Sequence, residues 1–376
     1  MNLAIDELRG RGTPDRAAVH AFLSRGGFPL AEGSRVTFVY RGAADAVRLR
    51  HWIFGLPSSM DLARVEGTEL WYLVVELPAG SRVEYKFEIV AAGERTLIMD
   101  PLNPLVAHDP MGSNSVCQAS GYETPEWAMA DDEARPGELE DLSVPDDAGE
   151  QRVTVYIPAR YRRHRRYPLL VVHDGDDYLR FAALQTVLDN LIHRLEIPPM
   201  IVALTRPRER LLDYADAPAH ARFLAERLLP TLEERYTLMA DSSGRGLMGA
   251  SFGAVASLAA AWRYPGRFGR LLLQSGSFAF TDIGEQRRGP AFDPVVKFVN
   301  AFRADPGTPA EKVFVSCGMY ESLIYENRSM LPLLQSTGME VRYTEARDGH
   351  NWENWRDRLR EGLSWLFPGP LWLVYE

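Results

Sequence analysis

Two patterns of apolar and polar residues divide the chain. In its first third, short segments alternate polar and apolar side chains and are separated by turn residues, which is typical of half-buried strands. These segments are Arg35–Arg41, Val47–Arg50, Leu70–Glu76 and Val83–Ile89. The alternation predicts an immunoglobulin-like β-sandwich over residues 31–120, preceded by a helical lead-in at residues 1–30.

The second half of the chain shows continuous apolar runs with helix-forming stretches between them. The runs are Tyr167–His173, Met200–Thr205, Arg245–Met248 and Lys312–Gly318. Short uninterrupted runs of this kind indicate strands that are covered on both faces, as in a mainly parallel sheet. We therefore expect an α/β domain over residues 151–376.

An acidic segment, residues 121–150, separates the two patterns. It holds eleven Asp or Glu residues against one Arg. The whole chain carries a net charge of −9, so the remainder is close to neutral. Runs of one charge are usually solvated, and the segment is predicted to be a linker.

The stretch Gly249-Ala-Ser251-Phe-Gly253 has the form G-x-S-x-G and lies between a strand-like run and a helix-forming run. A strand, a tight turn and a helix are what a nucleophile elbow requires, because flanking glycines permit the sharp turn that exposes the serine hydroxyl. Ser251 is therefore the candidate nucleophile.

A serine nucleophile needs a base and a carboxylate that orients the base. His350 lies in a loop after the last predicted strand, whereas His173, the one rival, ends an earlier strand. The preferred carboxylate is Glu321, because it follows a strand that ends at a glycine. Asp348 and Asp282 are the alternatives.

The oxyanion of such a reaction needs two backbone N–H donors. One is expected from Phe252, the residue after the nucleophile. The other is expected from Gly175 or Asp176, in the loop that follows the strand Tyr167–His173. The competing interpretation of that loop is a plain Asp-Gly turn.

Several motifs occur in an order that resembles a known family. They are Val155–Pro158, Tyr167–Leu170, His173–Gly175, Val187–Ile192, Pro198–Ile201, the elbow and Gly349–Trp352. From Val153 to about Phe367 the chain resembles the putative-esterase family of α/β-hydrolases, which includes the enterochelin esterases. Asp100–Pro104 resembles the turn that closes their N-terminal domain, and also that of the sandwich modules of starch-branching enzymes.

The resemblance implies an α/β-hydrolase fold for residues 151–376 and a serine carboxylic-ester hydrolase with Ser251 as nucleophile, Glu321 as acid and His350 as base. It favours a catecholate siderophore lactone as substrate and leaves open whether that substrate carries iron. A carbohydrate, feruloyl or acetyl esterase and an acyltransferase are the alternatives within the superfamily. A glycan-binding protein with an inactive hydrolase domain, using Trp52 or Trp71, is the alternative outside it.

An anionic aromatic substrate would be held by arginine and aromatic side chains near the site. Candidates are those that follow predicted strands or catalytic residues, namely Arg206, Arg210, Tyr325, Trp352 and Arg356.

Composition excludes other classes of function. The only basic cluster, Arg160–Arg166, sits in a predicted turn, which argues against nucleic-acid binding. No apolar run reaches the length of a membrane span, and no Cys/His set has the spacing of metal ligands, so neither membrane partner, metal nor cofactor is expected. Two cysteines in different predicted domains favour a reducing cytoplasm. Oligomeric state is left open.

Overall fold

The computed structural model describes residues 3–10, 12–147, 149–215, 218–281 and 288–370, and these form two compact units. The first unit comprises residues 1–124 together with two short loops, Gly318–Glu321 and Ala346–Asn351. The second comprises residues 125–317, 322–345 and 352–376. Within the described ranges, no helix is long and apolar enough to cross a membrane.

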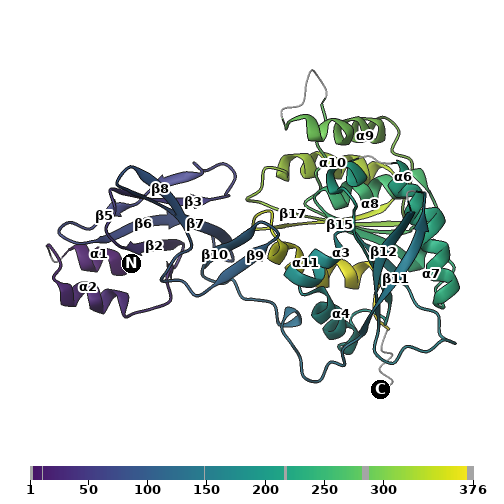
Figure 1. Ribbon diagram of the computed structural model, residues 1–376, viewed down its shortest axis with the longest axis horizontal. Coiled ribbons are helices and arrows are strands. Elements are labelled where there is room, and N and C mark those ends of the chain that lie inside the picture. The colour runs from purple at the N-terminus through teal and green to yellow at the C-terminus, as the bar shows by residue number, and fades with distance from the viewer. Residues whose placement is uncertain (1–2, 11, 148, 216–217, 282–287, 371–376) are drawn as a thin grey trace. The chain divides into compact units, whose positions relative to one another are not determined.

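The first unit contains two antiparallel sheets and two N-terminal helices (Figure 1). The helices are α1 (Ala4–Arg9) and α2 (Arg16–Leu23). One sheet has the order β1-β2-β6-β5, with β1 at Leu30–Glu32, β2 at Arg35–Arg41, β6 at Leu70–Glu76 and β5 at Ala63–Arg64. The other has the order β4-β3-β7-β10-β9, with β8 also paired to β7. Its strands are β4 (Ser59–Asp61), β3 (Ala46–His51), β7 (Arg82–Ala91), β8 (Glu94–Ile98), β9 (Val106–Asp109) and β10 (Gly112–Gln118).

Apolar residues from both sheets share one core, so the first unit is a β-sandwich. Phe38 of β2 packs edge to face on Tyr85 of β7, with ring centroids 4.9 Å apart. The alternation in the sequence produces this arrangement, because every second side chain of each strand points inward. The immunoglobulin-like topology of the sandwich stays a prediction.

The second unit is built on an eight-stranded sheet of order β11-β12-β14-β13-β15-β16-β17-β18. The strands β14, β13, β15, β16 and β17 are parallel, and β11 and β12 extend the sheet in antiparallel pairing. The bounds are β11 (Glu138–Asp146), β12 (Gly149–Ile157), β13 (Leu169–Val172), β14 (Ile201–Thr205), β15 (Arg245–Ala250), β16 (Arg270–Gln274), β17 (Lys312–Gly318) and β18 (Glu340–Ala346).

Helices cover both faces of this sheet (Figure 1). One face packs against α5 (Arg210–Tyr214), α6 (Pro218–Arg222), a π-helical turn (Phe223–Leu228), α7 (Leu229–Arg235), α8 (Phe252–Arg263), α9 (Asp293–Ala304) and α10 (Ile324–Ser336). The opposite face packs against α3 (Gly175–Phe181), α4 (Leu184–His193) and α11 (Trp352–Leu366). Successive residues of one strand enter opposite cores: Val171 joins the first and Val172 the second. This double burial explains the continuous apolar runs in the sequence. Three 3₁₀ turns complete the unit, at Glu126–Ala128, Ser242–Gly244 and Pro290–Phe292.

The prediction of a linker over residues 121–150 needs correction. Residues Glu138–Asp146 form the edge strand β11, which pairs along its whole length with β12. Most of its side chains are solvent-facing, and several carboxylates pair with arginines, as Asp141 does with Arg152 and Glu140 with Arg235. An edge strand with exposed acidic side chains has the composition of a solvated connector, so charge alone could not distinguish the two.

Candidate active site

Ser251 occupies a strained turn between β15 and α8. Its backbone has φ 58° and ψ −118°, a conformation that L-residues rarely adopt. Two glycines make the turn feasible. A Cβ on Gly249 would lie 2.4 Å from the carbonyl carbon of Gly253, and one on Gly253 would lie 3.1 Å from the Cβ of His173. The turn therefore has the geometry of a nucleophile elbow.

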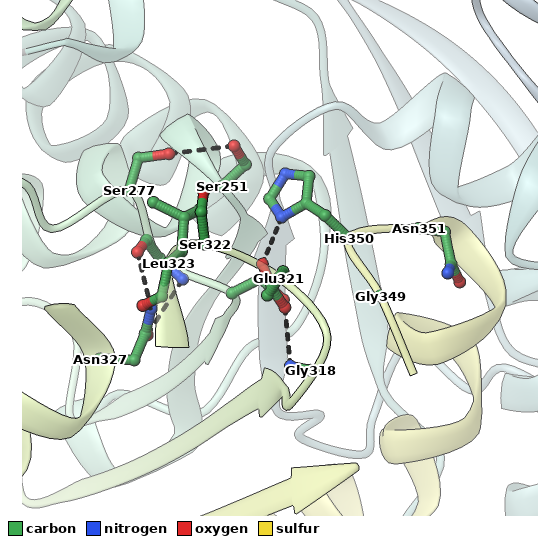
Figure 2. A network of polar contacts seen from close by, with 12 residues as sticks. Ser251, Ser277, Gly318, Glu321, Ser322, Leu323, Asn327, Gly349, His350 and Asn351 are labelled. Atoms are coloured by element: carbon green, nitrogen blue, oxygen red, sulfur yellow. Dashed lines mark hydrogen bonds and ion pairs between the residues drawn. The ribbon is translucent and has the colours of Figure 1, made fainter. Parts of the chain in front are cut away.

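The serine is held against the neighbouring strand. Its N–H donates to the carbonyl of Gln274 at 2.9 Å, and its carbonyl accepts from the N–H of Ser277 at 3.2 Å. The two hydroxyls of Ser251 and Ser277 are 3.1 Å apart (Figure 2). Ser251 is 9 % exposed as a whole residue.

His350 and Glu321 form a hydrogen-bonded pair in the first unit (Figure 2). The distance between His350 Nδ1 and Glu321 Oε2 is 2.5 Å. The other carboxylate oxygen accepts from the Gly318 N–H at 2.6 Å. Because a carboxylate can only accept, Nδ1 carries the proton, and in the neutral ring the lone pair is on Nε2. Such an imidazole is set up to act as a base through Nε2.

The loops that carry this pair are joined to each other. The Met319 N–H donates to the Ala346 carbonyl at 2.7 Å, and the Tyr320 N–H donates to the Asp348 carbonyl at 3.0 Å. These contacts bring the segment after β17 against the segment after β18, which is why residues 29 positions apart meet.

The alternative carboxylates do not occupy the position next to the base. Asp348 accepts instead from the Gly349 N–H and from the Asn351 amide, each at 2.7 Å, and lies 3.4 Å from Arg82. Burial raises the pKa of Asp348 to about 6. Asp282 lies outside the described residues.

His173, the rival base, is committed to other groups in the core. Its Nδ1 is 3.1 Å from the Met248 carbonyl and 3.0 Å from the Ser257 hydroxyl, and its Nε2 is 3.0 Å from Nε2 of His220. Since a carbonyl only accepts, Nδ1 of His173 is the donor, and Nε2 of the neutral ring then accepts from His220. Burial holds the pKa of His173 well below its usual value and lowers that of His220 to about 4.

This buried pair predicts a pH-dependent contribution to stability. The folded-state pKa of His220 is depressed, so its contribution is present above the unfolded value of about 6.5 and is lost as pH falls toward 4. Between pH 7.5 and pH 5 the loss should be about 2 kcal/mol. The difference in unfolding free energy between the wild type and His220→Gln, measured by urea denaturation, is expected to shrink by that amount. The exposed His164→Gln is the control, and parallel curves for the wild type and His220→Gln would refute the prediction.

Two helix N-termini offer the backbone donors expected for an oxyanion. Phe252 is the first residue of α8 and Gly175 the first of α3, so the N–H of each is among those with no acceptor inside its helix. A Cβ on Gly175 would lie 2.4 Å from that of Leu204, so the loop needs glycine there. The preceding Asp174 has φ 53° and accepts a bidentate contact from Arg210 at 2.8–3.0 Å. The loop leads directly into α3 and is held by the ion pair of Asp174 with Arg210, so it is more than a plain Asp-Gly turn.

The residues predicted to contact substrate have different surroundings. Arg206 pairs with Asp176 at 2.6 Å, and the guanidinium of Arg210 lies 6.0 Å from the centroid of the Phe252 ring, beside the elbow. Tyr325 is 62 % exposed, and Arg356 is turned to Asp357 at 2.8 Å.

Trp352, another of these candidates, is largely buried, and its role as a substrate contact stays a prediction. It is buried in the core between the sheet and α11, with the rings of Tyr178 and Trp355 at centroid distances of 5.2 and 4.7 Å. As the first residue of α11, it faces the apolar strands because the helix packs that side onto the sheet. Its aromatic side chain therefore serves packing.

Three further polar residues lie around these groups. Ser277 lies against Ser251, and the fully buried Asn327 bridges the N–H and carbonyl of Gly276 at 3.1 and 2.8 Å. Arg82, at the start of β7, contacts Asp348 and Asn351. No local pattern marks Ser277 or Arg82, and sequence reasoning missed both.

Comparisons with known proteins agree with this architecture. The model of the family described as Putative esterase matches residues 148–366. The Iron(III) enterobactin esterase of Escherichia coli (strain K12) is 23 % identical over 336 residues, which cover 82 % of this chain and 81 % of that protein. The uncharacterized protein YjcH of Bacillus subtilis (strain 168) is 26 % identical over 222 residues, covering 57 % of this chain and 90 % of it.

Solved structures show the same fold. The ferric enterobactin esterase of Salmonella typhimurium superposes with a TM-score of 0.73 at 20 % identity, covering 88 % of this chain and 93 % of that one. A ferulic acid esterase superposes with a TM-score of 0.53, covering 62 % of this chain and 97 % of its own length. The eight-stranded unit is accordingly of the α/β-hydrolase type.

Proposed function

Because this chain belongs to the Putative esterase family and is a carboxylic ester hydrolase, we propose that it cleaves esters through Ser251, His350 and Glu321. The observation that carries the proposal is the 2.5 Å hydrogen bond from His350 to Glu321 in a chain whose Ser251 has the backbone of a nucleophile elbow. The topology supports it as well. Strands β15 and β17 are parallel through β16, and Ser251 and Glu321 follow their carboxyl ends.

The proposed chemistry is two-step acyl transfer. His350 Nε2 takes the proton of the Ser251 hydroxyl as its oxygen attacks the ester carbonyl carbon, and then gives that proton to the departing alkoxide. A water molecule, deprotonated in turn by His350, attacks the acyl-enzyme and releases the acid and Ser251. Glu321 keeps the imidazole in the Nδ1-protonated tautomer and stabilises the imidazolium that forms in each step.

The developing oxyanion is assigned to the N–H groups of Phe252 and of the Gly175–Asp176 loop. These donors are aimed by helix N-termini, whose dipoles favour negative charge. The salt bridge from Arg210 to Asp174 supports the role of the loop, because it fixes the residue before Gly175. Asp174 is buried. Burial raises the pKa of its carboxyl group, and the charge of Arg210 counteracts part of that rise.

A catecholate siderophore lactone is the substrate class that we propose. Relatives over most of the chain are named Iron(III) enterobactin esterases, at 23–24 % identity. Such a ligand is anionic and aromatic, and the arginine and tyrosine side chains of Arg206, Arg210 and Tyr325 have the matching chemistry. Arg206 and Tyr325 are also exposed enough to meet a ligand.

The substrate proposal is tested by comparing esters. We expect kcat/KM for enterobactin, with or without iron, to exceed that for p-nitrophenyl acetate and methyl ferulate by about 10²-fold or more, because contacts remote from the reacting carbonyl raise the rate. Turnover of the simple esters alone would discard the siderophore. If added alcohol leads to a new ester in place of the free acid, the protein is an acyltransferase.

A binding protein with an inactive hydrolase domain is the outcome if no ester is turned over. In that case Trp52, which is 58 % exposed, is the side chain to test against glucans, since Trp71 is buried and donates to the Gly42 carbonyl.

A further inference from the structure

The loops that carry Glu321 and His350 are hydrogen-bonded to loops of the sandwich and to the start of β7 in the first unit. The Arg82 N–H donates to the Arg347 carbonyl at 2.9 Å, and the Arg347 guanidinium donates to the Ala79 carbonyl at 2.6 Å. On the other loop, the Tyr320 carbonyl accepts from the Phe54 N–H at 2.7 Å, and the Tyr320 hydroxyl lies 2.6 Å from that of Ser81. Each loop is therefore held by both backbone and side-chain contacts.

The side chain of Arg82 reaches the residues on either side of the Gly349-His350 pair. Arg82 is 2 % exposed. Its Nη1 lies 3.1 Å from Asn351 Oδ1 and 3.4 Å from Asp348 Oδ1, with Glu84 on its own strand at 3.1 Å. One buried guanidinium thus contacts both ends of the four-residue segment that contains the proposed base.

Asp348 shapes that segment into a turn. One of its carboxylate oxygens accepts from the Gly349 N–H and from the Asn351 side-chain amide, and the Asn351 N–H in turn donates to the Gly349 carbonyl at 3.2 Å. A buried carboxylate is unfavourable unless a charge is paired with it. Arg82 supplies that charge, so the turn depends on a residue 266 positions earlier in the chain.

We propose that Arg82 is a positioning residue for His350: from the first residue of β7 it holds the Asp348–Asn351 turn and thereby aims the imidazole. The inference rests on the proposed function, in which His350 is the base. Arg82 acts through Asp348 and Asn351, and its burial keeps it from direct contact with a substrate.

The test is the kinetics of Arg82→Met on p-nitrophenyl acetate. Displacement of a catalytic group by about 1 Å costs on the order of 10²-fold in rate, so kcat should fall by about 10- to 100-fold. KM should stay within about threefold, because no ground-state contact with the ester is removed. Arg82→Lys, which keeps the charge but not the planar fork, should recover part of the loss.

A matched control separates positioning from mere stability. Arg48→Met removes a partly buried arginine from the same sheet, which pairs with Asp61 and Glu88 and contacts neither loop. It should keep kcat within about twofold even where its thermal midpoint falls. Equal losses of kcat in both variants, an unchanged kcat in Arg82→Met, or a change in KM alone would overturn the inference.

Two further variants keep the outcome decisive. Should Arg82→Met fail to fold, Asn351→Ala removes one contact of Arg82 and the amide contact to Asp348 while leaving the ion pair, and a loss of about fivefold or more in kcat is then expected. Wild-type rates in that variant would overturn the inference. Ser251→Ala is measured alongside. If this variant retains activity, the proposed function fails. If Ser251→Ala is inactive while Arg82→Met has wild-type kcat, only the role of Arg82 is refuted.

Discussion

Replacing Ser251 with alanine is expected to lower kcat by about 10⁴- to 10⁶-fold. The substitution removes the atom that forms the acyl-enzyme, and only the oxyanion donors and substrate binding would remain to accelerate hydrolysis by water. The loss corresponds to about 5 to 8 kcal/mol in the activation free energy. Steady-state hydrolysis of p-nitrophenyl butyrate measures it, with KM expected to change little.

Ser277→Ala is the matched control, because this buried serine lies 3.1 Å from the Ser251 hydroxyl. It removes a neighbouring hydroxyl of the same kind, and it should keep activity within about tenfold, the cost of one lost hydrogen bond. If Ser277→Ala showed the large loss and Ser251→Ala the small one, Ser277 would be the nucleophile. Equal rates for wild type and Ser251→Ala would exclude the proposed mechanism.

Replacing Glu321 with glutamine is expected to lower kcat by about 10³- to 10⁴-fold. Glutamine preserves the volume of the side chain, but its amide N–H₂ can donate to Nδ1 and so favour the tautomer with the proton on Nε2. That tautomer cannot take the proton of Ser251, and the imidazolium loses its counter-charge. The measurement is kcat across pH 6–9, where the variant should stay below wild type throughout.

The same change at the neighbouring acid tests the assignment. Asp348→Asn keeps an acceptor for the Gly349 N–H and removes only a charge that is paired with Arg82. Its loss in kcat should resemble that of Arg82→Met, about 10- to 100-fold, and stay well below that of Glu321→Gln. A greater loss in Asp348→Asn would make Asp348 the orienting acid.

Local sequence was sufficient for the elbow and for placing Glu321 directly after a strand, whereas its pairing with His350 depends on contacts between two loops. Gly249 is required by a contact with Gly253, four residues later, so the motif and its flanking strand and helix contain that information, whereas the contact of Gly253 with His173 is distant in sequence. Glu321 follows β17 at a glycine whose N–H it accepts, again a local relation. The continuous apolar runs likewise predict the covered strands, because burial on both faces leaves no polar alternation.

Other features depend on contacts that no local pattern records. The strand β11 is as acidic as a solvated linker, and its pairing with β12 is seen only in the structure. Trp352 follows His350 almost directly, yet the start of α11 turns it into the core. Arg82 belongs to an alternating strand and differs from its neighbours only in a partner 266 residues away.

The grouping of the Glu321 and His350 loops with the N-terminal sandwich bears on how such enzymes can be recombined. A hydrolase transplanted without residues 1–124 would carry its serine intact but would lose the groups that hold the loops of Glu321 and His350, namely Phe54, Ala79, Ser81 and Arg82. We therefore expect an exchanged N-terminal sandwich to support activity only if it supplies equivalent contacts to these two loops. A replacement sandwich should therefore be chosen for residues equivalent to these four. We also expect these four positions to covary with the two loops more strongly than the two hydrophobic cores covary with each other.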